Sequence, residues 1–339
     1  MKFRDKIFNE NVFEKYLRTL PSTKENSLIK NGLFTVVNKY KSKMSEQAGG
    51  YFVTEPIKGR IGGDPVNYDG QTDIGEGAER PTYKQTKICY GRANIWGEYD
   101  FASEVTGENF MAEAQEVKEY WDGERQKTVL SILKGIFSMT GGVNAQFVDS
   151  HTYKVAGNLE ADSLNRASQK ALGDKKQALE MMFTHSAVST NLEGLNLINF
   201  LKYTDADGIE RDLTIGTFNG KLVVVDDDMP AVEGTEEDAG FTLYTSYVFK
   251  KGFFEFEDLG VEKAVELVRD AKAKGGKNEL ISRIREMIVP YLISYKDTTK
   301  ISPMNEDFEK GANWELVNDG NGKYVEPKLI PVVRIISRG

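Results

Sequence analysis

The chain has 339 residues, of which 40% are hydrophobic and 28% are charged, and its 44 Lys and Arg against 52 Asp and Glu give a net charge of −8. With 18 Phe, 15 Tyr and 3 Trp this composition can build a core, which excludes wholesale disorder. One Cys and two His exclude a disulfide scaffold and any zinc site that lacks carboxylate ligands. Because neither a signal-peptide core nor a long apolar run occurs, we expect a soluble intracellular protein that binds no membrane.

The first 45 residues are basic and the rest of the chain is acidic. Residues 1–45 hold ten Lys and Arg against four Asp and Glu, a balance of +6, and the remaining residues hold 34 against 48, a balance of −14. Short helices are predicted at residues 12–20 and 22–31, where Ser22 and Glu25 form a capping box. The basic segment is typical of an arm that seeks an acidic partner surface, with chance clustering on solvated helix faces as the alternative.

Residues 49–80 are unusually rich in glycine, with eight in 32 positions. A strand-like stretch at 51–57 precedes this segment, and β-type alternation over 83–99 follows it. The simplest interpretation is a long two-stranded hairpin whose tip, residues 59–80, has no regular structure and almost no core-forming side chains. Since a two-stranded ribbon is marginally stable in water, we expect this one to lie on another surface, such as another molecule.

The next signal is a long amphipathic helix over residues 109–138, a rod of roughly 45 Å at about 1.5 Å per residue. Beyond it, the patterns predict short helices at 164–172, from Asp174 and from Thr190; a hairpin of strands 213–218 and 222–225; a hairpin of strands 241–249 and 253–256; helices at 261–274 and 278–289; and strands at 291–295, 314–317 and 330–336. This order predicts an α+β fold.

Candidate chemical motifs are incomplete. Gly275, Gly276 and Lys277 lack the spacing of a phosphate-binding loop, and Asp205 and Asp207 lack the first ligand of a calcium loop. The densest carboxylate cluster is Asp226, Asp227 and Asp228, which we interpret as a solvated strand exit.

The single cysteine and the histidines give no catalytic pattern either. His151 and His185 are interpreted as ordinary surface or half-buried histidines, and Cys89 as a buried small apolar residue. Trp121 is expected in the core. We therefore predict no catalytic, cofactor-binding or metal site.

Two further stretches complete a recognisable pattern: Leu-Val-Val-Val-Asp-Asp-Asp-Met-Pro from Leu222, and Trp-Glu-Leu-Val from Trp314 followed by Ile-Pro-Val-Val-Arg-Ile-Ile from Ile330. Together with the basic arm, the glycine-rich hairpin and the long helix, they resemble the major capsid proteins of tailed double-stranded DNA bacteriophages, whose fold was first described for a Hong Kong phage. The resemblance covers nearly the whole chain by layout.

The resemblance implies a tailed-phage capsid fold. The implied domains are an N-terminal arm (1–48), an extended β-hairpin or E-loop (49–100), a peripheral domain with a spine helix (101–145), mainly the axial domain with part of the peripheral domain (146–297), and C-terminal strands (298–339). It also implies a non-enzymatic coat protein that assembles in the host bacterial cytoplasm, as pentamers and hexamers, into an icosahedral shell around double-stranded DNA. A portal protein and a separate scaffolding protein are implied partners.

In such a shell the hairpin tip would meet the long helix of a neighbouring copy. The candidate inter-subunit contacts are Arg60, Glu76, Glu79 and Arg80 in the tip and Glu116, Lys118 and Glu119 in the helix. Lys58 is placed for the isopeptide crosslink of some relatives, but nothing identifies a partner and no crosslink is expected. Two alternatives stay open: an encapsulin-type nanocompartment shell, and a carboxylate- or metal-dependent hydrolase that uses Asp226 and Asp228.

Overall fold

The structure is a computed structural model in which residues 32–46, 50–71, 73, 80–100, 114–204, 210–235 and 238–339 are described. The helices and strands of this part are β1 (Phe34–Val36), α3 (Tyr40–Glu46), β2 (Phe52–Lys58), β3 (Thr82–Ile88), β4 (Tyr90–Tyr99), α5 (Ala114–Ile136), α6 (Gly142–Ser150), β5 (Thr152–Asn158), α7 (Ser163–Leu172), β6 (Met181–Thr184), α8 (Ser186–Gly194), β7 (Asn199–Thr204), β8 (Glu210–Phe218), β9 (Lys221–Val225), β10 (Ala231–Glu233), β11 (Thr242–Phe249), β12 (Phe254–Asp258), β13 (Val265–Asp270), β14 (Lys277–Pro290), β15 (Ile293–Tyr295), α9 (Asn305–Phe308), β16 (Trp314–Leu316) and β17 (Val332–Arg338). This is the predicted α+β pattern.

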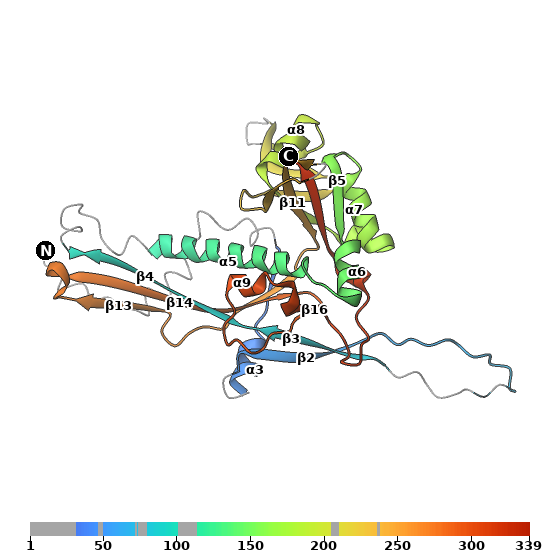
Figure 1. Ribbon diagram of the computed structural model, residues 1–339, viewed down its shortest axis with the longest axis horizontal. Helices are drawn as coiled ribbons and strands as arrows, with labels where there is room; N and C mark the ends of the chain where they lie inside the picture. The colour runs from blue at the N-terminus through green and yellow to red at the C-terminus, as the bar shows by residue number, and fades with distance from the viewer. Residues whose placement is uncertain are drawn as a thin grey trace.

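Two parts of the molecule are plain in Figure 1: a long lower part with α5, β4, β13 and β14, and an upper part with β5, β11, α7 and α8. The β2–β3 hairpin projects from the lower part to one side. The largest buried cluster includes Ile136 of α5, Phe249 of β11 and Val332 of β17, so one core joins the two parts. In the described part of the chain no helix combines the length and apolar composition that a membrane span needs.

The sheet of the lower part is built around β14, which pairs antiparallel with β4, β12 and β13. The helices predicted at 261–274 and 278–289 are therefore wrong. Glu, Lys, Arg and Leu favour a helix there by intrinsic propensity, but residues 277–286 pair along their whole length with β4, and Leu280 and Ser282 are buried at alternate positions. Pairing on both edges outweighs a propensity that is weak for each residue.

Helix α5 runs along this sheet in Figure 1. The predicted long helix is confirmed over Ala114–Ile136, while residues 109–113 lie outside the described residues. Val117 and Trp121 of α5 pack against Val265 and Leu280 of the sheet, and Trp121 is 5% exposed, as expected for a core residue.

The sheet of the upper part has eight strands in the order β5-β17-β11-β6-β9-β8-β7, with β10 paired to β11. The predicted hairpin of β8 and β9 is confirmed, and its turn residues Asn219 and Gly220 have φ values of 49° and 73°, which Asn-Gly adopts readily. The predicted helix at 164–172 is confirmed as α7, which ends at Gly173. The predicted strands of the tail are confirmed as β15, β16 and β17.

Three other predictions for this region are wrong. β11 pairs with β6 and β17 whereas β12 pairs with β1 and β14, so Gly252 (φ 70°) carries the chain between two sheets and closes no hairpin. The helix predicted from Thr190 begins earlier, at Ser186, and residues 199–204 form β7. The segment from Asp174 is a short 3-10 helix, Gly173–Ala178.

The predicted arm, residues 1–48, has its last part packed into the body. β1 pairs in parallel with β12, and Leu33, Tyr40 and Met44 are buried. Residues 1–31, with both helices predicted there, lie outside the described residues.

Candidate assembly surfaces

The predicted glycine-rich hairpin is confirmed in its two strands. β2 and β3 pair antiparallel in unbroken register from Phe52 with Ile88 to Lys58 with Thr82. The predicted second strand, 83–99, is divided at Cys89, because β4 leaves the hairpin and joins β14. Cys89 is 2% exposed, which confirms it as a buried residue.

The base of the hairpin, β2 and β3, is attached to the chain's own body. Val53 is 2% exposed and Gln85 is 5% exposed. The Nε2 atom of Gln85 donates hydrogen bonds of 3.0 Å to the backbone carbonyls of Pro290 and Ile293. Buried amides that find two acceptors hold a strand in place, because leaving them unpaired costs free energy.

A cluster of charges joins the hairpin base to α3 and β12. Lys87 of β3 is 4% exposed, and its Nζ atom lies 2.6 Å from Glu55 Oε2 and 3.2 Å from Glu255 Oε2. Lys43 of α3 also pairs with Glu55, and the Tyr40 hydroxyl donates to Glu255. Burial by itself would raise the pKa of Glu55, but the hydrogen bonds from Lys43 and Lys87 outweigh it and lower the pKa to about 2.

Lys87 belongs to no motif that we recognised in the sequence. A signal was nevertheless present, because Gln85 and Lys87 alternate with the more exposed side chains of β3 and so share one face of the strand. A lysine on the inward face of a ribbon requires carboxylate partners.

The tip of the hairpin, residues 59–80, contrasts with this base. The described tip residues form no helix or strand, and Ile61 and Tyr68 are 82% and 91% exposed. Of the predicted contact residues, Arg60 is exposed and Arg80 donates from Nε to the carbonyl of Gly59 at 2.6 Å. Glu76 and Glu79 lie outside the described residues.

The predicted contact residues of the long helix lie near the start of α5. Glu116 is exposed, whereas Lys118 and Glu119 are half-buried and already interact within the chain. In Figure 1 this end of α5 and the hairpin tip lie on opposite sides of the molecule. Within one chain the structure therefore does not bring the described tip candidates to the helix candidates.

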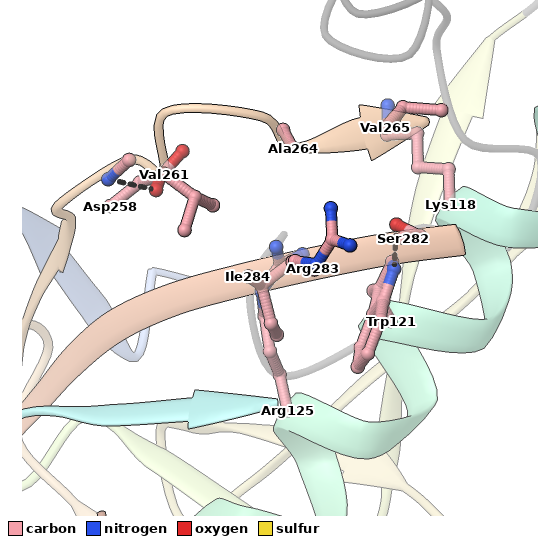
Figure 2. Close-up of a pocket in the computed structure, with 11 residues that line it drawn as sticks. Lys118, Trp121, Arg125, Asp258, Val261, Ala264, Val265, Ser282, Arg283 and Ile284 are labelled. Atoms are coloured by element: carbon pink, nitrogen blue, oxygen red, sulfur yellow. Dashed lines mark hydrogen bonds between the residues drawn. The ribbon is translucent and has the colours of Figure 1, made fainter. Parts of the chain in front are cut away.

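A cavity of about 190 Å³ lies between the start of α5 and β14 (Figure 2). Lys118 and Trp121 form its helical side, and the indole Nε1 of Trp121 donates to Ser282 Oγ at 2.9 Å. Among its described lining residues Asp258 is the single carboxylate, and it accepts a hydrogen bond from the backbone of Gly260 at 2.9 Å. The cavity thus seats the helix and offers no carboxylate pair for acid–base chemistry.

A second contact fixes α5 on the sheet. The guanidinium of Arg125 donates to Glu286 at 2.8 Å and to Asp122 at 2.6 Å, and the Tyr90 hydroxyl donates to Glu286 at 3.1 Å. Burial opposes the charge of Arg125, but Glu286 and Asp122 outweigh it and raise its pKa. A buried, fully paired cluster of this kind specifies one placement of the helix.

The predicted carboxylate cluster is a solvated strand exit. Asp227 and Asp228 are exposed after β9, and Gln126 of α5 donates to Asp226 and, at 3.2 Å, to Asp228. No group of three or more His, Cys, Asp or Glu side chains within the described ranges is close enough to hold a metal ion. Asp205 and Asp207 lie outside those ranges.

The prediction for one histidine is wrong. His151 is fully buried, where its ring stacks on Phe147 at 4.3 Å and Nδ1 lies 3.1 Å from the Phe147 carbonyl. Burial lowers the pKa of His151 to about 4, and Nε2 has no hydrogen-bond partner in the described structure. His185 is half-buried, as predicted, and accepts a hydrogen bond from Ala187 N at the start of α8.

Comparisons with known proteins agree on one class. No family model matches the chain. The major capsid protein of Bacillus phage SPP1 is 27% identical over 341 residues, which cover 99% of this chain and 98% of the relative.

Solved structures give the same result at the level of the fold. The cyanophage Pam1 capsid asymmetric unit superposes with a TM-score of 0.56 at 9% identity, over 100% of this chain and 98% of the other. The capsid of Ralstonia phage GP4 gives a TM-score of 0.55 at 8% identity, over 91% and 87%. The acid-stable capsid of Helicobacter pylori bacteriophage KHP30 gives 0.53 at 11% identity, over 100% and 99%. The α+β fold of this chain is therefore the fold of phage capsid proteins.

Proposed function

We infer that this chain is a major capsid protein of the tailed-phage type, which forms the shell of a phage head. We infer also that its exposed hairpin tip contacts further copies of the same chain. The protein is a structural protein of the virion. The phage proteins found in the comparisons favour this function over the nanocompartment and hydrolase alternatives.

One observation carries the proposal of contact through the tip: a ribbon with a firmly attached base and an exposed end. Lys87 at the base is 4% exposed, whereas Tyr68 at the tip is 91% exposed. Burying one large aromatic side chain stabilises a contact by roughly 1.5–3 kcal/mol, which the tip does not gain within its own chain. A second copy supplies the missing surface.

The domain division follows from this function. Residues 1–48 act as an arm, and the β2–β3 hairpin acts as the E-loop. The sheet topology supports placing β4, β13 and β14 with α5 in the peripheral domain, and the eight-stranded sheet in the axial domain. In this proposal β4 belongs to the peripheral domain although it lies within the predicted segment 49–100, because it pairs with β14, and β13 and β14 are the peripheral part of the segment 146–297.

We also propose the assembly in which these parts act. Copies form pentamers and hexamers, and these close into an icosahedral shell around double-stranded DNA. A separate scaffolding protein guides closure and a portal protein occupies one vertex. The excess of 52 acidic over 44 basic residues supports a container wall to which DNA does not adhere.

Charge pairs between copies are part of this proposal. Arg60, Glu76, Glu79 and Arg80 of one tip face Glu116, Lys118 and Glu119 of a neighbouring α5. Exposed ion pairs contribute about 0–1 kcal/mol each, so these pairs set the register of neighbours more than the strength of the shell.

The test is a deletion of the tip. Residues 59–81 are replaced by Asn-Gly, a two-residue turn that joins Lys58 to its strand partner Thr82. We expect the parent chain to form megadalton particles by light scattering and closed shells by negative-stain microscopy. The deletion variant should give a soluble subunit with an unchanged circular dichroism spectrum and no shells.

A matched control replaces the tip by a Gly/Ser linker of equal length. This variant keeps the spacing of β2 and β3 and loses the side chains, so it should fold and fail to assemble as well. Normal shells from either variant would contradict the proposed role of the tip.

A further inference from the structure

A groove of about 360 Å³ lies near the hairpin base, between the start of β4, the middle of β14 and residues 301–302. Eleven residues of the described part of the chain line it: three are arginines (Arg92, Arg283 and Arg285), and none of the eleven is Asp or Glu. Its apolar lining includes Ile284 and Ile301, and Ile301 is 71% exposed. We call this surface the arginine groove.

Two of the three arginines have no carboxylate partner among the described residues. Arg285 donates from Nη2 to a backbone carbonyl at 3.0 Å, and Arg92 donates from Nη2 to the carbonyl of Pro303 at 2.9 Å. Across the described ranges neither guanidinium forms an ion pair, whereas Arg283 contacts Glu266 at 3.2 Å. Guanidinium groups bind carboxylates in preference to carbonyls, so the groove suits an acidic partner with apolar side chains.

The hairpin tip of this chain has that composition. Ile61, Val66 and Tyr68 are 82%, 52% and 91% exposed. Residues 61–71 contain Asp64 and Asp69 and no Lys or Arg. Asp64 makes no hydrogen bond or ion pair with the part of the chain that the structure describes. The first 45 residues, with a balance of +6, would be repelled by the same groove.

The tip of one copy does not reach its own groove. Tyr51 lines the groove and receives a hydrogen bond on its carbonyl from Cys89 N at 3.0 Å, so the groove adjoins the hairpin base. In Figure 1 the chain after β2 runs straight away from the body. An extended segment from residue 51 to residue 68 spans roughly 55 Å. A compact chain of this length has a radius of gyration of about 20 Å, so an extended tip lies far from the groove beside residue 51.

We propose that the tip of one copy binds in the arginine groove of the next copy. Asp64 and Asp69 face Arg285 and Arg92, and the side chains of Ile61 and Tyr68 cover Ile301. This inference rests on the proposed function and names the surface that receives the tip.

The contact is head to tail, because tip and groove are different surfaces of the same chain. Heterologous contacts of this kind close into rings when the rotation between copies permits it. The groove also adjoins the cavity under α5, since Val261, Arg283 and Ile284 line both. Arg60 and Arg80 of a seated tip are then free to face the charges of α5.

The first experiment traps the contact with cysteines. In the full-length Cys89→Ser chain, Tyr68→Cys or Asp64→Cys in the tip is combined with Ile301→Cys at the groove. A matched chain combines each tip cysteine with Arg166→Cys, an exposed position on α7 outside the groove. Disulfides form where Cβ atoms come within about 4.5 Å. Oxidised particles should give a ladder of chain multimers on a non-reducing gel with Ile301→Cys and single chains with Arg166→Cys.

The second experiment exchanges charges. Arg285→Glu should lower the assembled fraction about tenfold, which is about 1.4 kcal/mol per contact. Asp64→Arg in the same chain should restore it. Arg166→Glu changes an exposed arginine on α7 that lies outside the groove and should assemble as the parent does.

The outcomes distinguish a failure of the arginine groove from a failure of the capsid function. Normal particles that crosslink as well through Arg166→Cys as through Ile301→Cys, or through neither position, overturn the arginine groove and leave the capsid function intact. Failure of Asp64→Arg to rescue folded Arg285→Glu also overturns the groove. A parent chain that forms no particles overturns the capsid function and the groove together.

Discussion

The base and the tip of the hairpin are neighbours in sequence and opposites in packing. Val53 and Lys87 of the base are 2% and 4% exposed, whereas Val66 and Tyr68 of the tip are 52% and 91% exposed. We therefore expect substitutions at the base to act on the folding of the subunit, and substitutions at the tip to act on the proposed contacts between subunits. In this view the base of the hairpin stabilises the subunit and the tip serves assembly, and the difference can be tested directly.

The largest effect is expected for Lys87→Met. The change leaves Glu55 and Glu255 without their buried cation, and breaking a buried pair in this way costs about 4 kcal/mol. Urea denaturation of the subunit measures the loss. Lys58→Met, at the exposed outer end of β2, is the matched control and should cost less than about 0.5 kcal/mol. Equal losses in the two variants would remove the distinction between base and tip.

The second-largest effect is expected from acid, which should lower the free energy of unfolding through the hairpin base. The pKa of Glu55 is about 2 in the folded chain and 4.5 as a free side chain, so its stabilisation is complete above pH 4.5 and is lost as the pH falls toward 2. Because Lys43 is half-buried and water screens part of its pairing with Glu55, we expect the lost stabilisation to be about 2 kcal/mol. The free energy of unfolding, measured against pH, should fall less steeply in Glu55→Gln. Glu233→Gln on exposed β10 should keep the parent slope.

A pair of identical substitutions compares packing alone. Val53→Ala opens a cavity in a buried cluster and should destabilise the subunit by about 1.5 kcal/mol. Val66→Ala removes the same atoms from the tip and should change the free energy of unfolding by less than about 0.5 kcal/mol. The comparison fails if both valines give the same change.

The smallest effect on folding is expected from cleavage of the tip. Trypsin should cut the free subunit first after Arg60, which is exposed on a segment without regular structure. The subunit should keep its circular dichroism spectrum, and assembled particles should resist cleavage at this bond. Equally fast cleavage in subunits and in particles would place the tip in solvent in both states.

The features predicted correctly from sequence are those with local signals. Glycine content marked the tip, Asn219 and Gly220 marked the β8–β9 turn, and apolar spacing marked α5. The strands β13 and β14 were mistaken for helices because their helix-favouring composition is local, whereas their pairing with β4 and β12 joins segments far apart in sequence.

The same mistake hid the arginine groove. With a helical period, Arg283 and Arg285 lie about 200° apart around the helix axis. In a strand with a period of two they share a face. The burial of His151 was also out of reach, because it depends on a stack with Phe147 that only the folded chain forms. The capsid fold itself was accessible through the order of elements, which survived these local errors.

The position of β17 has a consequence for how each subunit folds during its synthesis. β17 lies between β5 and β11, and its Val332 and Ile335 are fully buried, yet residues 159–331 separate it from β5. At ordinary rates of translation the ribosome needs on the order of ten to thirty seconds to make that stretch. During this wait β5 has an open edge, and so has β11 once it is made, and such edges attract strands of other nascent chains. We expect newly made subunits to depend on chaperones until the ribosome has made β17, which completes the sheet.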